Sequence, residues 1–177
     1  RYDGASWSIL TYERHIQIPA KLDGSVGSQP TTIDFFTAGG LQYSNVGTKN
    51  AFCQFEVPDD WDGGDMYFEV DWMPDGGATT GNNVDFLIEY RAIAEGELLN
   101  NGTSVTIYSP DGTGYSQYQT KHARFTLDHD HAHQPLARQD HVYLRISRNN
   151  GVSNNYTGTV TVLGYELIYN SVAAPTT

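Results

Sequence analysis

The chain has 177 residues, of which 18% are charged and 12% aromatic, and it carries 18 glycines and one cysteine. Ten Lys and Arg residues oppose 21 Asp and Glu residues, which gives a net charge of −11. This balance repels phosphate backbones and anionic lipids, so we expect neither nucleic acid nor a membrane as a partner. A single cysteine excludes an intramolecular disulfide, and no apolar run approaches the roughly 18 residues of a membrane helix.

The first thirty residues differ from the rest of the chain. Residues 7–18 alternate poorly between apolar and polar side chains, and residues 19–30 are a mixed loop. This pattern predicts an extended N-terminal arm over residues 1–30, docked on its own domain or on a neighbour. A similar tail is expected over residues 171–177, so the domain itself is predicted at residues 31–170.

Four segments show the period-two alternation of antiparallel strands with one buried face: residues 51–57, 66–72, 84–91 and 141–147. In the first segment Cys53 falls on the apolar face, which predicts a buried and inert thiol. Phe52 falls on the opposite face, and the same parity turns Tyr67 and Tyr143 outward in their own segments.

Shorter strands are predicted at residues 31–36, 104–109 and 123–127, and a longer one at residues 158–169. In the long strand Val160 and Val162 are even-numbered whereas Tyr165 and Leu167 are odd, so we expect a β-bulge near Gly164. Turns rich in Gly, Pro, Asp and Asn are predicted at residues 58–60, 62–65, 74–77, 110–112 and 149–151. Residues 90–99 are the one segment that suits a short helix.

Seven or eight short strands joined by such turns indicate an all-β protein, either an antiparallel β-sandwich or a closed barrel. We predict a β-sandwich of the jelly-roll type with an extended N-terminal arm. An immunoglobulin-like sandwich is less favoured, because the Cys–Trp–Cys spacing of immunoglobulin domains is absent.

The sequence lacks the motifs of common catalytic sites: a nucleophile elbow, a phosphate-binding loop, a dinucleotide-binding glycine pattern and a zinc-protease motif. The five carboxylates of residues 56–65 could form a glycosidase acid–base pair or hold Ca²⁺. Acids clustered around one Gly-rich turn are more typical of solvated turn formers. We therefore expect a non-enzymatic protein without a cofactor.

Residues 128–133 read Asp-His-Asp-His-Ala-His. If the strand before them continued, His129, His131 and His133 would project to one side, at a spacing that lets imidazoles share Zn²⁺. A polar loop that begins near Leu127 is favoured, because continued parity would point three imidazoles into the core. The three histidines remain the metal or symmetry-axis candidate, and their titration would make association depend on pH.

Exposed aromatic side chains are the remaining candidates for binding. Trp61 lies in the acidic turn, and Tyr115 and Tyr118 follow the Gly-rich residues 112–114. Such rings can stack on sugars or anchor a protein interface, although large rings also close the rim of a sandwich. The predicted partner-binding set is Trp7, Tyr12, Ile16, Trp61, Tyr115 and Tyr118.

Five stretches of the sequence resemble a family of tailed-phage virion proteins: residues 52–61 (FCQFEVPDDW), 66–74 (MYFEVDWMP), 80–90, 142–148 and 156–169. The resemblance rests on strand and turn residues rather than on a catalytic signature. It implies a trimeric jelly-roll structural protein of the bacteriophage virion, of the capsid decoration (cement) or fibre-head type. The arm and residues 129–133 depart from the family pattern, so the resemblance implies nothing about them.

The leading hypothesis is a capsid decoration protein on the outer surface of the virion. It would bridge subunits of the major capsid protein as a homotrimer, using a rigid sandwich and extended arms. The alternative is a carbohydrate-binding module or a receptor-binding fibre head, with a surface glycan as its partner.

Overall fold

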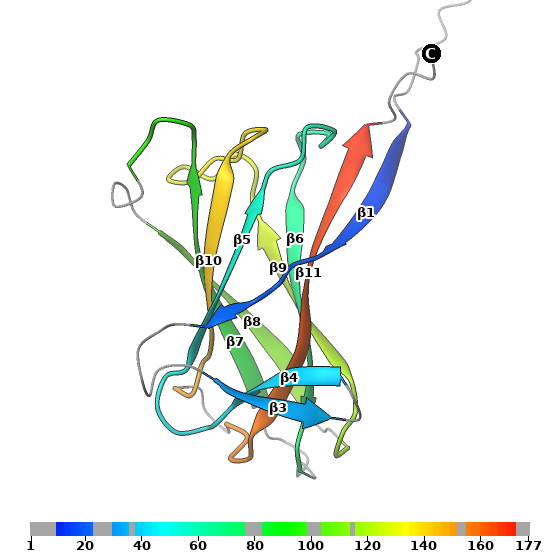
Figure 1. The fold of residues 1–177 in the computed structure, drawn as a ribbon, viewed down its shortest axis with the longest axis vertical. Coiled ribbons are helices and arrows are strands. Elements are labelled where there is room, and N and C mark those ends of the chain that lie inside the picture. The colour runs from blue at the N-terminus through cyan, green and yellow to red at the C-terminus, as the bar shows by residue number, and fades with distance from the viewer. Residues whose placement is uncertain are drawn as a thin grey trace, which may run out of the picture.

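The computed structural model describes residues 10–22, 30–35, 38–76, 83–98, 104–113, 116–151 and 155–172, which form two antiparallel sheets packed face to face (Figure 1). The first sheet contains β1 (Thr11–Gln17), β3 (Thr31–Phe35), β4 (Ala38–Tyr43), β6 (Met66–Pro74), β9 (Lys121–Leu127) and β11 (Val160–Val172). The second contains β2 (Lys21–Leu22), β5 (Asn50–Glu56), β7 (Asn83–Ile93), β8 (Val105–Thr113) and β10 (His141–Arg148). Within the described segments, no helix is long and apolar enough to cross a membrane.

The order of the strands defines a jelly roll. The first sheet runs β3-β4-β11-β6-β9, with β1 beside the C-terminal half of β11, and the second runs β2-β5-β10-β7-β8. The pairs β4–β11, β5–β10, β6–β9 and β7–β8 form one long antiparallel ribbon. This ribbon rolls up until β11 also pairs with β6 and β10 also pairs with β7. The predicted all-β, antiparallel jelly-roll sandwich is confirmed.

Alternate side chains of each strand fill the space between the sheets. On β5, Cys53 and Phe55 are buried whereas Gln54 and Glu56 are exposed, and the same period of two holds along β9 and β10. This confirms the inward parity of Cys53. Burial raises the pKa of its thiol to about 12, so the thiolate is scarce at neutral pH.

Large aromatic side chains dominate the centre of the core. The rings of Trp72 and Phe86, from opposite sheets, lie 5.8 Å apart. The hydroxyls of Tyr43 and Tyr165 lie 2.9 Å apart and satisfy each other inside the core. Burial raises the pKa of both phenols, which keeps the pair neutral.

β11 contains the expected bulge. Its pairing with β6 shifts between Val162 and Gly164. Before the shift Val160 and Val162 are buried, and after it Tyr165 and Leu167 are buried. The extra residue moves the apolar side chains from even to odd positions and so keeps them in the core.

Two local predictions are wrong. Residues 90–98, the described part of the expected helix, are not helical, because β7 continues to Ile93 and a turn follows at Gly96, whose φ is +85°. Cross-strand pairing with β10, which reaches Ile93 and His141, overrides the helix propensity of this segment. The expected turn at residues 110–112 lies inside β8, which pairs with β7 up to Thr113.

Part of the predicted arm docks on its own domain. β1 pairs antiparallel with β11, and Ile18 donates its backbone N–H to the Tyr165 carbonyl at 2.8 Å. The chain then crosses to the second sheet, where β2 pairs with β5. In Figure 1 the start of β1 and the end of β11 lie together at the upper right of the molecule. Every side chain of β1 is exposed, so the second sheet does not cover this strand.

Candidate functional site

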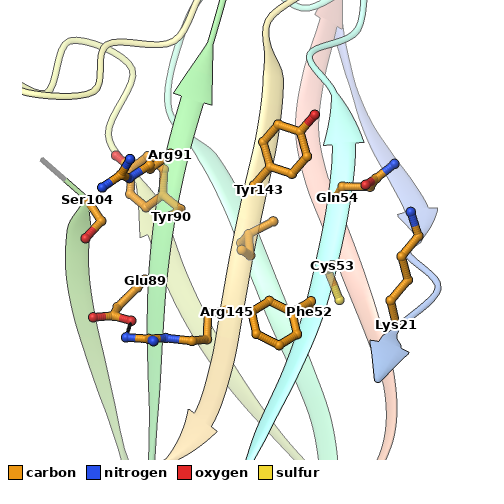
Figure 2. Close-up of a pocket in the computed structure, with 11 residues that line it drawn as sticks. Lys21, Phe52, Cys53, Gln54, Glu89, Tyr90, Arg91, Ser104, Tyr143 and Arg145 are labelled. Atoms are coloured by element: carbon orange, nitrogen blue, oxygen red, sulfur yellow. Dashed lines mark ion pairs between the residues drawn. The ribbon is translucent and has the colours of Figure 1, made fainter. Parts of the chain in front are cut away.

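A groove of about 370 Å³ lies on the outer face of the second sheet, across β5, β10 and β7 (Figure 2). Its volume falls within the range of small-ligand sites. Its lining combines side chains on the outer face with parts of three residues whose side chains are buried. The outer-face residues are Lys21, Phe52, Gln54, Glu89, Arg91, Ser104, Tyr143 and Arg145, and the buried ones are Cys53, Tyr90 and Leu144.

Strand register brings these side chains together from distant parts of the sequence. Arg145 on β10 is the Cα partner of both Phe52 on β5 and Glu89 on β7, which places the three in one row across the sheet. The next row holds Gln54, Tyr143 and Arg91 in the same order. Lys21 pairs with Phe52 and extends the first row at the β2 edge.

Two aromatic rings supply the apolar part of the groove. Tyr143 is 37% exposed and Phe52 is half-buried, and they lie on neighbouring strands in neighbouring rows. Gln54 and Arg91 flank Tyr143. Ser104 lies at the rim on the Arg91 side, across the groove from Lys21 (Figure 2). Flat apolar rings bordered by amide, hydroxyl and guanidinium groups match a pyranose ring, which has an apolar face and a rim of hydroxyls.

The described lining of the groove contains few of the groups that glycoside hydrolysis uses. Among the described lining residues Glu89 is the one carboxylate, and Arg145 holds it in an ion pair. Glycoside hydrolysis normally uses two carboxyl groups on either side of the scissile bond. The high pKa of Cys53 also makes its thiol a poor nucleophile.

Trp61 is not available to a partner, contrary to the sequence-based prediction. The residue is 3% exposed, its indole Nε1 donates to the Gly64 carbonyl at 3.0 Å, and its backbone bridges to Ser171 of β11. Arg138 donates two hydrogen bonds to the Trp61 carbonyl, at 2.7 and 3.1 Å. The acidic turn therefore folds its tryptophan inward against the end of the sandwich.

The other predicted partner-binding residues that the structure describes do not converge on one site. Tyr12 and Ile16 are 52% and 39% exposed and share one face of β1. Tyr118 is 49% exposed, with a φ of +61°, between β8 and β9. These three do not line the groove, and Trp7 and Tyr115 lie outside the described residues.

The histidine loop starts where β9 ends, at Leu127, as the favoured alternative predicted. His129 Nδ1 lies 2.9 Å from an Asp65 carboxylate oxygen, and this hydrogen bond raises the pKa of His129 and lowers that of Asp65. These two residues and Asp128 bring ligand atoms within 4.8 Å of one another.

The structure does not bring the three histidines together as the less favoured alternative, a three-histidine metal site, requires. In the part of the chain that the structure describes, His131 and His133 contribute no ligand atom to the group around His129. Their rings instead pack against each other, 5.9 Å apart. The loop does not continue the strand, so the alternation that would align the three imidazoles is lost. A metal ion at this loop would be held by two carboxylates and one imidazole.

A second mixed group lies on the outer face of the first sheet. His122 Nδ1 lies 2.6 Å from Asp71 and 3.2 Å from Glu69, and Arg124 Nε lies 2.8 Å from the other oxygen of Glu69. Asp71, Glu69 and His122 also bring ligand atoms within 4.8 Å of one another. As the structure stands, the group is an ion-pair network between β6 and β9.

Comparison with known proteins gives similarity of fold alone. No family model matches this sequence, and no curated protein sequence matches it. Solved structures that share the strand arrangement include phage, viral and carbohydrate-binding proteins, at identities of 7–12%.

Three of these structures illustrate the range. The enzymatically active domain of bacteriophage CBA120 tailspike protein 4 has a TM-score of 0.41 at 7% identity, over 92% of this chain and 19% of the tailspike chain. The xylan-binding module CBM15 has a TM-score of 0.39 at 12% identity, over 92% of this chain and 97% of the module. The infectious bursal disease virus Gx strain structure has a TM-score of 0.42 at 10% identity, over 94% of this chain and 33% of the viral chain. The shared fold therefore does not define the function of this chain, which depends on the chemistry of its own site.

Proposed function

We propose that the protein is a non-enzymatic glycan-binding domain whose site is the groove on the outer face of the second sheet. The observation that carries the proposal is the pair Phe52 and Tyr143, which the β5–β10 register places diagonally, on neighbouring strands and in neighbouring rows, amid hydrogen-bonding side chains. Aromatic rings that stay partly exposed on a regular strand have no core to fill, and they suit stacking on a sugar ring.

A glycan microarray probed with the wild-type protein and two tyrosine variants tests this proposal. Tyr143→Ala removes a groove ring, whereas Tyr12→Ala removes a ring of greater exposure on β1, outside the groove. We expect wild type and Tyr12→Ala to bind the same glycans, and Tyr143→Ala to bind them about tenfold more weakly, which corresponds to about 1.4 kcal/mol. No binding on the array, or equal loss in both variants, would overturn the proposal.

A role as a virion structural protein is the second candidate, favoured by the surface of β1. Leu10, Tyr12 and Ile16 are exposed, and β1 pairs with β11 on one side only among the described strands. By the β1–β11 register, Tyr12 and Ile16 lie on the same face as the buried Ser171 and Leu167, beyond the cover of the second sheet. An uncovered inner face on an edge strand suits assembly with another subunit.

In this second candidate the protein is a homotrimeric capsid decoration protein that bridges major capsid protein subunits on the outer surface of a phage head. Sedimentation measures its mass in solution. The expected species is a trimer that Ile16→Lys dissociates and that Tyr143→Ala leaves intact. Capsids assembled without the protein should lose their content at lower temperature than decorated ones, and equal heat stability would exclude the decoration role.

A further inference from the structure

The charge of the groove is opposite to that of the protein. The whole chain carries 21 acids and 10 Lys and Arg residues, yet the described lining of the groove contains three cations, Lys21, Arg91 and Arg145, and one acid, Glu89. A positively charged groove on an acidic protein attracts negatively charged ligands to that part of the surface.

The outer face of the first sheet is acidic, in contrast to the groove on the second sheet. It presents four carboxylates, Glu13, Glu69, Asp71 and Glu166, and their described ion-pair partners are Arg124 and two histidines, His15 and His122. Glu69 and Glu166 are even direct cross-strand neighbours. The cations of the groove are therefore a property of that face of the sandwich and not of the surface in general.

The cations also sit at separate points of the groove. Lys21 lies on β2 at one edge and Arg91 lies on β7, three strands away, which corresponds to roughly 14 Å at the usual strand spacing. Phe52 and Tyr143 lie on the two strands between them. A ligand that stacks on the rings and meets both cations must carry negative groups near both ends.

We propose that the groove takes an acidic oligosaccharide with at least two carboxylates, such as a chain of uronic acid residues. Sugar rings lie on Phe52 and Tyr143, one carboxylate meets the Arg91 guanidinium, which can bind it through two hydrogen bonds, and another meets the Lys21 ammonium. Arg145 adds a hydrogen-bond donor at the centre, where Glu89 holds its guanidinium in place. This inference rests on the proposed glycan-binding function and names its ligand class.

The test uses two probes with the same sugar backbone, one with charged carboxylates and one with neutral methyl esters. Oligogalacturonate and the same oligosaccharide with its carboxyl groups methyl-esterified are titrated calorimetrically into the wild-type protein, in the presence of a chelator that removes bridging calcium. Arg91→Gln and Lys21→Gln test the two ends of the groove. Lys121→Gln, on β9 of the other sheet, is the matched control that changes the net charge equally. A glycan array with neutral and acidic members widens the range of ligands.

The expected result is that the acid binds at least tenfold more tightly than its ester. Arg91→Gln and Lys21→Gln should each weaken binding of the acid threefold to tenfold, and Lys121→Gln should leave it unchanged. Equal binding of acid and ester, or binding of neutral glycans alone on the array, would overturn the acidic ligand class while the glycan-binding function stands. Equal weakening in all three variants would overturn the assignment to the groove cations. Absence of binding to every glycan would overturn both proposals.

Discussion

Arg145 forms an ion pair with Glu89, its direct cross-strand neighbour, at the centre of the groove. The guanidinium is about half exposed and the carboxylate about a quarter exposed. The pair therefore lies in a well-solvated setting, where such an interaction contributes about 0–1 kcal/mol to stability. Its larger effect is on the electrostatics of the groove, because the Glu89 carboxylate offsets the positive charge of Arg145.

Glu89→Gln should strengthen binding of oligogalacturonate, because it removes the one acid of the lining and leaves the shape of the side chain unchanged. The expected gain in affinity is about threefold to tenfold at low salt, smaller in 0.5 M salt because screening weakens the repulsion that is removed. Calorimetric titration of the variant beside wild type measures it. A loss of affinity would show that Glu89 supports binding, through a ligand contact or through the position of the Arg145 guanidinium, more than its charge opposes it.

Asp75 connects three segments at the opposite end of the sandwich from the acidic turn. Its carboxylate accepts hydrogen bonds from Gln42 at 2.6 Å, Thr159 at 2.7 Å and Thr161 at 2.6 Å. Thr161 is fully buried, so its hydroxyl has no access to water as a replacement partner. Asp75→Ala should lower the free energy of unfolding by about 2–3 kcal/mol.

Urea unfolding followed by tryptophan fluorescence measures this change. Glu56→Gln, an exposed acid on β5, is the control and should stay within about 0.5 kcal/mol of wild type. If both variants unfold at the same urea concentration, Asp75 does not stabilise the fold as its contacts indicate.

Gly158 lies against the ring of Tyr156, which is itself buried. A Cβ at position 158 would lie 2.3 Å from the tyrosine hydroxyl oxygen, which is far inside van der Waals contact. Arg148 donates to the Gly158 carbonyl at 2.6 Å and to the Tyr156 carbonyl, so the loop cannot easily move aside. Gly158→Ala should cost about 1–3 kcal/mol through overpacking.

Gly151→Ala is the matched control, because a Cβ there meets its nearest neighbour at 3.5 Å, an ordinary contact. Thermal unfolding of the two variants should separate them, with Gly158→Ala melting several degrees lower. Equal melting temperatures would mean that Tyr156 rearranges at little cost.

The ion pair of His129 and Asp65 predicts a pH dependence of stability. The raised pKa of His129 adds stability that is complete below pH 6.5 and is lost as the pH rises through the pKa of the folded protein. The lowered pKa of Asp65 adds stability that is complete above pH 3.8 and is lost as the pH falls through its folded value. The pair is therefore strongest between these limits.

His129→Gln should reduce stability most near pH 5 and least near pH 9, relative to wild type. Urea unfolding at pH 5, 7 and 9 checks this, with Asp65→Asn expected to show the same trend and the double variant expected to show no further loss. A loss that is equal at pH 5 and pH 9 would show that the contact stabilises by packing and not by charge.

The sequence predicted those elements whose two faces differ in burial. β5, β6, β7 and β10 have apolar residues on one face, and the bulge at Gly164 followed from the shift of the apolar residues between even and odd positions. β1 could not be predicted in this way, because both of its faces are exposed and no alternation marks it. Its formation depends on pairing with β11, in which every residue pair is at least 149 residues apart in sequence.

The groove was not predicted because it depends on strand register. The parity of Phe52 and Tyr143 placed both on outward faces, which is the signal that could have found the site. Their proximity, however, requires β5 to pair with β10, and these strands are separated in the chain by four others. Trp61 was predicted to be exposed because its neighbours in sequence are acidic. The turn instead folds inward, and the indole donates a hydrogen bond to the Gly64 carbonyl.

Backbone NMR of the isotope-labelled protein, titrated with oligogalacturonate and with its methyl ester, tests most directly whether the groove is the glycan site. We predict shifts of amide resonances at residues 52–54, 89–91 and 143–145, with no change along β1. Shifts confined to β1 or to the histidine loop, or no shift with either saccharide, would contradict a glycan site on the outer face of the second sheet.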